Sequence, residues 1–138
     1  GGNSDRPADP EADREAYSAA RGKLLERDFD AAATAFEDYL KDFPQGQFRA
    51  HAHFWLGEVY TNQKSPQLDK ARKQFQTVVD DYPNHSRAPT SLYKLASLQA
   101  QAGNTGEAEV SLHKLIKQFP DASEAEMAKS MLKQLNGD

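Results

Sequence analysis

The side chains in this sequence that could do acid–base or metal chemistry are four histidines and many carboxylates. His51 and His53 are two residues apart, so on a helix they would point to different faces. His85 falls in a connection and His113 on an outer helix surface. Because a metal site needs ligands that converge, we expect these histidines to be polar surface or groove residues. The carboxylates fit helix ends and caps better than a catalytic pair.

The remaining catalytic motifs are also missing from the sequence. It contains no cysteine, and therefore no thiolate nucleophile and no Cys-type zinc site. It also lacks a Gly-rich phosphate loop, a Gly-x-Ser-x-Gly elbow and a His-Glu-x-x-His motif. We therefore predict a non-enzymatic protein without metal or cofactor.

A recurring aromatic position offers binding chemistry instead. Tyr17, Phe54 and Tyr93 each stand three residues before a small one. Polar side chains follow on the same helix face, namely Arg21, Glu58, Asn62, Ser97 and Gln101. Large aromatics with polar neighbours are typical anchors for a partner, and we predict that these eight residues line a concave groove for a peptide or helix. The alternative is that the rings pack only against neighbouring repeats.

Helices must position these residues, because apolar residues recur at spacings of three and four. Aromatic–proline pairs end the helical stretches, since proline lacks an amide donor and restricts the residue before it. The predicted helices after the first pair lie at 50–63, 68–81, 88–102, 105–118 and 123–136.

Several helix starts carry capping signals. Asp9 before Pro10 fits the start of the first helix. Asn104 with Glu107, and Ser123 with Glu126, resemble capping boxes.

The helices form three copies of one pair. Prolines 44, 83 and 120 are separated by 39 and 37 residues, and the second-helix residues Phe36, Phe75 and Leu112 keep these separations. In the first helices the small residues are 37 and 39 apart, at Ala20, Gly57 and Ala96. A two-residue insertion in the turn at 64–68 explains both orders.

The middle copy carries the tetratricopeptide (TPR) pattern, with Leu-Gly and Tyr in its first helix and Ala, Phe and Pro in its second: Leu56, Gly57, Tyr60, Ala71, Phe75 and Pro83. We predict an all-α, right-handed TPR superhelix of three helix-turn-helix repeats and a C-terminal capping helix. The predicted domain is 10–138, with repeats at about 10–44, 50–83 and 88–120 and the capping helix at 123–136. Residues 1–9 are predicted to be a disordered linker or remnant.

Bulk composition restricts the partners. The chain has 138 residues, 38% hydrophobic and 28% charged, which is typical of one soluble domain. Its net charge of -4 gives no basic footprint, so we expect no nucleic-acid partner. No apolar run approaches the roughly 20 residues that span a bilayer, so we expect no direct membrane insertion.

The segment Phe54-Trp55-Leu56-Gly57-Glu58, with Ser91-Leu92-Tyr93-Lys94-Leu95-Ala96 and the Phe/Tyr-Pro ends, resembles a known family. It is similar to the C-terminal TPR domain of the periplasmic Tol-Pal accessory protein, the YbgF or CpoB type. The similarity extends over about residues 14–135. The first repeat departs from the pattern, with Ala16, Ala19 and Lys23 where the middle one has His53, Leu56 and Tyr60.

The resemblance implies an adaptor in the periplasm of a Gram-negative bacterium. Its expected partners are a TolA-like periplasmic domain and a peptidoglycan synthase, and its expected role is to coordinate outer-membrane constriction with peptidoglycan synthesis during cell division. Family members form oligomers through an upstream coiled coil that this sequence does not include.

Two alternatives stay open. One is another envelope-assembly TPR scaffold, of the BamD lipoprotein type, which shares the Phe/Tyr-Pro ends. The other is an enzyme or small-ligand binder, which would need a deep pocket with clustered histidines and carboxylates.

Overall fold

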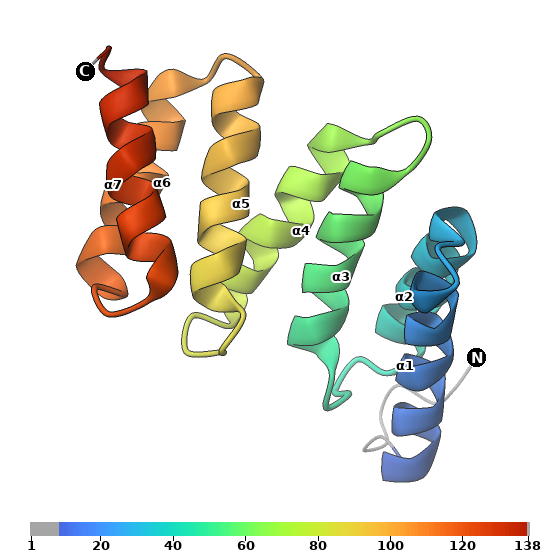
Figure 1. Cartoon of the computed structure of the whole chain (residues 1–138). Coiled ribbons are helices and arrows are strands. Elements are labelled where there is room, and N and C mark those ends of the chain that lie inside the picture. The colour runs from blue at the N-terminus through green and yellow to red at the C-terminus, as the bar shows by residue number, and fades with distance from the viewer. Residues whose placement is uncertain (1–8, 138) are drawn as a thin grey trace. The chain divides into compact units, whose positions relative to one another are not determined.

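Seven α-helices make up residues 9–137, the part of the chain that the computed structural model describes (Figure 1). They are α1 (Pro10–Leu25), α2 (Phe29–Asp42), α3 (Arg49–Asn62), α4 (Leu68–Asp81), α5 (Ala88–Gln101), α6 (Thr105–Gln118) and α7 (Ser123–Leu135). No strand occurs among these residues. The all-α, TPR-like fold predicted from the sequence is confirmed. Of the predicted linker, only Asp9 is among the described residues.

Two compact units divide the chain, and their boundary falls inside α4, between Gln74 and Phe75. Unit 1 holds α1–α3 and the first part of α4. Unit 2 holds the second part of α4 and α5–α7. Each unit is described by itself below. The hand of the superhelix and the boundaries of the three repeats stay predictions.

Helix starts agree with the sequence signals only in part. Asp9 caps α1 as predicted, because its carboxylate accepts the amide proton of Glu11 at 3.1 Å. The two predicted capping boxes are wrong. Asn104 precedes α6 without a side-chain capping bond. Ser123 lies inside α7, whose N-cap is Ala122, because the backbone bond between Ala125 N and Ala122 O (3.0 Å) begins that helix one residue earlier.

Helices α1 and α5 end in the same kind of turn. In each, one residue has a left-handed backbone, Arg27 with φ 62° and Gly103 with φ 86°. The next amide then reaches back five residues, from Asp28 to the Lys23 carbonyl (3.0 Å) and from Asn104 to the Gln99 carbonyl (2.9 Å). This six-to-one bond is the Schellman motif, which favours glycine at the left-handed position.

Unit 1 is built by α1 packing on α2 and α2 on α3. Ala20 and Ala32 are fully buried, so these helices approach closely. Phe36, Tyr39 and Tyr60 are buried, as predicted for core aromatics. The aromatic residues before the prolines were also expected in the core but are only half-buried, since each sits at a helix end where solvent reaches one edge: Phe43, Tyr82 and Phe119.

A buried polar cluster connects α1, α2 and the loop before α3. Asp13, with no exposed surface, accepts the Tyr39 hydroxyl proton and, at 2.7 Å, the amide proton of Gln47. The Tyr39 oxygen in turn accepts the amide proton of Phe48 at 2.9 Å. Burial first, and then the hydrogen bond to Asp13, raise the pKa of the Tyr39 hydroxyl above its ordinary value. Gly46 is required beside it, because a Cβ there would lie 2.4 Å from the Tyr39 oxygen.

Unit 2 packs α5 on α6, and α7 on both. Ala96, Ala108 and Leu112 form its buried centre. The predicted apolar side of α7 is partly wrong. Its fully buried residues are Ala125 and Ala128, whereas Met127 is exposed. The small residues let α7 lie close to α5, where Thr90 donates a hydrogen bond to Glu124.

Candidate functional site

The aromatic residues predicted to line a groove lie mostly inside the helix packing. In unit 1, the Tyr17 ring stacks on Phe48 with centroids 4.6 Å apart, and its hydroxyl oxygen accepts the Trp55 Nε1 proton at 3.1 Å. Phe54 is 3% exposed and meets the Trp55 ring edge-on, with centroids 5.1 Å apart. In unit 2, Tyr93 is half-buried. The partner contact predicted for these rings stays a prediction.

Three of the predicted polar residues come together in unit 1. Arg21, Glu58 and Asn62 line one hollow of about 330 Å³. Trp55, which the sequence analysis did not place in the groove, forms part of its wall, with Leu24, Leu25, Arg27 and Phe29 as the other lining residues. Asn62 also donates a hydrogen bond to the Glu58 carbonyl at 2.7 Å, which fixes the amide at the end of α3.

This hollow, which we call the Trp55 hollow, combines charge with an apolar wall. The Arg21 guanidinium lies 5.4 Å from the centre of the Trp55 ring, within cation–π range. Arg27 lies at the same distance over Phe29. Leu25 is 74% exposed at the edge, which is high for a large apolar side chain. Arg and Trp are the residue types most enriched among residues that dominate binding energy.

The predicted residues of unit 2 share one face of α5. Tyr93, Ser97 and Gln101 are spaced by four residues, so they lie one above another along the helix. Tyr93 and Ser97 are half-buried and Gln101 is exposed. They are not among the residues that line the hollows found in this unit.

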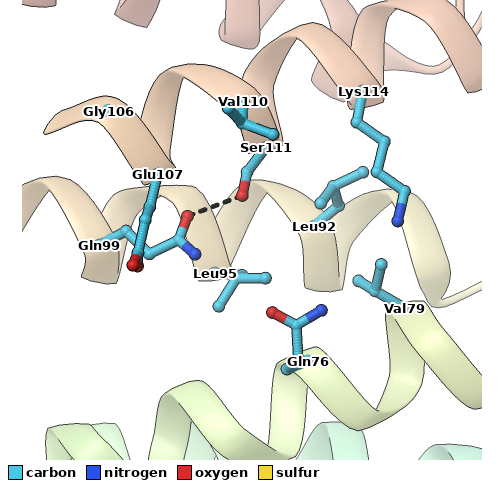
Figure 2. Close-up of a pocket in the computed structure, with 10 residues that line it drawn as sticks. All are labelled: Gln76, Val79, Leu92, Leu95, Gln99, Gly106, Glu107, Val110, Ser111 and Lys114. Atoms are coloured by element: carbon cyan, nitrogen blue, oxygen red, sulfur yellow. Dashed lines mark hydrogen bonds between the residues drawn. The ribbon is translucent and has the colours of Figure 1, made fainter. Parts of the chain in front are cut away.

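A larger hollow in unit 2 was missed by the sequence analysis (Figure 2). It measures about 520 Å³, and we call it the Gln99 hollow. It is lined by Gln76 and Val79 of α4, Leu92, Leu95 and Gln99 of α5, and Gly106, Glu107, Val110, Ser111 and Lys114 of α6. Gln99 accepts a hydrogen bond from the Ser111 hydroxyl at 2.7 Å, drawn as the dashed line in Figure 2.

The histidines do not form a metal site. Among residues 9–137, no group of three or more His, Asp or Glu side chains could hold a metal ion. His53 Nδ1 lies 2.8 Å from Gln74 Oε1, so it serves the packing of unit 1. Burial, and then the Arg87 charge, lower the pKa of His85, which accepts the Arg87 amide proton through Nδ1.

The comparison with known families extends over nearly the whole chain. The family described as outer membrane lipoprotein YfiO matches residues 9–137. The chain belongs to the YfiO family. Within the described residues, no helix has the length and apolar character needed to cross a membrane.

Two relatives of this YfiO-family chain bear the same name. They are the cell division coordinators CpoB of Pseudomonas putida strain KT2440 and of Pseudomonas putida, each 39% identical over 56 residues. The match covers 41% of this chain and 21% of each relative, so it spans about a fifth of their length. The resemblance to the CpoB type predicted from the sequence is confirmed over this part.

Proposed function

We propose that this chain is a non-enzymatic protein-binding scaffold of the Gram-negative periplasm. In this role it helps to coordinate outer-membrane constriction with peptidoglycan synthesis during cell division. The similarity to two cell division coordinators supports the process. The observation that carries the binding role is the Trp55 hollow, where Arg21, Glu58 and Asn62 surround an aromatic wall.

The Trp55 hollow suits a protein segment better than a metabolite. Its apolar wall would receive one or two side chains of a helix or peptide, and its polar groups would orient them. Arg21 and Arg27 outnumber Glu58 among its lining residues, so an acidic residue beside the anchoring side chain is favoured. We propose the TolA-like periplasmic domain as the first partner and a peptidoglycan synthase as the second.

The predicted face of α5 belongs to the same proposal. Tyr93, Ser97 and Gln101 would contact a partner segment, as would the exposed edges of Tyr17 and Phe54. Oligomerisation through a coiled coil of the full-length protein is a further part of it.

A second candidate is a scaffold of outer-membrane assembly of the BamD lipoprotein type. The match to an outer membrane lipoprotein family over residues 9–137 favours it. Under this candidate the same hollow would bind an assembly partner instead of TolA.

Calorimetric titration with the TolA periplasmic domain tests the first candidate. We expect saturable binding that Arg21→Glu weakens by about tenfold or more, because it reverses the charge beside Trp55. Lys41→Glu is the matched control, since it makes the same charge change on an exposed residue of α2 in the same unit. No binding of TolA to the wild-type chain would leave the assembly scaffold as the better candidate.

A further inference from the structure

The Gln99 hollow exists because one residue differs between equivalent positions of two repeats. Gln99 of α5 corresponds to Tyr60 of α3, since first helices of the second and third repeats are 39 residues apart. In unit 1 the Tyr60 ring is 4% exposed, and its hydroxyl donates a hydrogen bond to Glu37 of α2. The Lys70 ammonium of α4 lies 5.6 Å from the centre of the same ring. A phenol therefore fills this place in unit 1.

In unit 2 the corresponding place is open. The Gln99 side chain turns to Ser111 and is shorter than a tyrosine. Figure 2 shows Val79, Leu92 and Leu95 facing the gap between α4 and α6. These three side chains are almost fully buried, yet Val110 on the rim is 69% exposed. The result is an apolar floor below an open mouth.

We propose that the Gln99 hollow binds a tyrosine side chain of a partner protein. The ring would take the position that Tyr60 occupies in unit 1. Its hydroxyl would donate to Oε1 of Gln76, which corresponds to Glu37, because the Gln76 Nε2 group is already used in a bond to Asp80 (2.9 Å). The hollow is large enough, since about 520 Å³ exceeds the roughly 150 Å³ cavity that can hold a benzene ring.

The rim charges indicate which residues flank that tyrosine. Glu107 corresponds to Lys70, so the cation beside the ring in unit 1 is replaced by a carboxylate in unit 2. Lys114 lies at the other end of the rim, near Val79 (Figure 2). Among the described residues neither Glu107 nor Lys114 makes an ion pair. A segment with a basic residue on one side of its tyrosine and an acidic residue on the other would complement both charges.

The first test uses p-cresol, the tyrosine side chain alone, with binding followed by NMR of methyl groups in the intact chain. We expect saturable shifts of the Val79, Leu92, Leu95 and Val110 methyls with a Kd on the order of 1 mM, as for a ligand of this size. Gln99→Tyr should abolish the shifts, because it places a phenol in the hollow. Equal binding by wild type and by this variant would overturn the proposal.

A second variant covers the case in which Gln99→Tyr does not fold. Val110→Trp alters an exposed rim residue, so it should leave the fold intact and block the mouth. Met127→Trp is its control, because Met127 is exposed on α7 and does not line the hollow. If p-cresol binds the Val110→Trp and Met127→Trp variants equally, the site is not the Gln99 hollow.

The flanking charges are tested with two peptides, acetyl-Lys-Tyr-Glu-amide and acetyl-Ser-Tyr-Ser-amide. At low salt we expect the charged peptide to bind about three- to tenfold more tightly, from two surface ion pairs. The double variant Glu107→Gln, Lys114→Gln should remove that difference while p-cresol binding stays. Equal affinities in the wild type would refute the assigned flanking residues. None of these tests depends on TolA, so they can fail or succeed independently of the proposed function.

Discussion

Tyr39 and Asp13 meet in a hydrogen bond of 2.5 Å that is buried between α2 and α1. The bond is specific to the first helix pair. The positions equivalent to Tyr39 hold Val78 and Leu115, both fully buried and apolar. The first repeat therefore replaces part of an apolar core with a polar cluster that also fixes the amides of Gln47 and Phe48. This cluster sets the path of the chain from α2 to α3, on which Trp55 is carried.

Tyr39→Phe should lower the free energy of unfolding by about 1–3 kcal/mol. It leaves the Asp13 carboxylate and the Phe48 amide each without one buried partner. Urea denaturation followed by circular dichroism measures the change. Tyr93→Phe is the control, because Tyr93 is only half-buried, and it should cost less than about 0.5 kcal/mol. A Tyr39→Phe variant as stable as this control would contradict the role of the cluster.

Stability should also fall in alkaline solution because of Tyr39 and Tyr60. Burial first, and then hydrogen bonds to Asp13 and Glu37, raise the pKa of these two hydroxyls in the folded chain. A raised pKa means a stabilising contribution that is complete below about pH 10, the ordinary tyrosine value. It declines above that pH and is lost once the pH passes the raised pKa of the folded state.

The Tm between pH 8 and pH 11.5 measures this loss. The wild type should show a falling Tm above about pH 10, and Tyr39→Phe should show a shallower fall, because one of the two titrating groups is gone. Identical slopes in the two proteins would show that Tyr39 does not contribute.

Ser91→Ala should leave stability unchanged or raise it by up to about 1 kcal/mol. The Ser91 hydroxyl is fully buried and has no hydrogen-bond partner among the described residues, so its removal deletes an unpaid desolvation cost. The equivalent residue of α3 is already an alanine, Ala52. Ser111→Ala is the matched control, because it breaks the bond to Gln99 and should cost about 1 kcal/mol. Thermal unfolding of both variants decides the question, and a Ser91→Ala variant less stable than Ser111→Ala would contradict this assignment.

Arg27→Gly should stabilise unit 1 by about 0.5 kcal/mol. A left-handed backbone costs a residue with a side chain about 1–2 kcal/mol, part of which is offset here by the contact of Arg27 with Phe29. Gly103→Ala is the converse change at the equivalent turn and should destabilise by about 1 kcal/mol. Chemical denaturation of each variant gives the sign, and a destabilised Arg27→Gly protein would mean that the Phe29 contact outweighs the backbone strain.

The sequence predicted the helices well because spacing and proline record them directly. Ala20, Ala32 and Phe36 recur at fixed separations in later repeats, and all three are buried. Ser123 was assigned wrongly as a cap because the tight turn after Pro120 lets the backbone begin the helix without a side chain.

The candidate sites were harder to predict. Trp55 was missed because a wall of a hollow depends on where neighbouring side chains stop, which a helix face does not record. The Gln99 hollow was missed for a related reason. Its signal is a departure from the repeat, Gln99 in place of Tyr60, whereas the repeats were aligned by what they share.

The central claim is that the surface around Trp55 binds a periplasmic protein. A photo-crosslinking amino acid at Asn62, an exposed position that lines this hollow, tests it most directly when the chain is mixed with the TolA periplasmic domain. The same group at Lys41, exposed on α2, is the control. We predict a crosslinked product from position 62 that is much weaker from position 41 and disappears with Arg21→Glu. Equal crosslinking from both positions, or none from position 62, would contradict the claim.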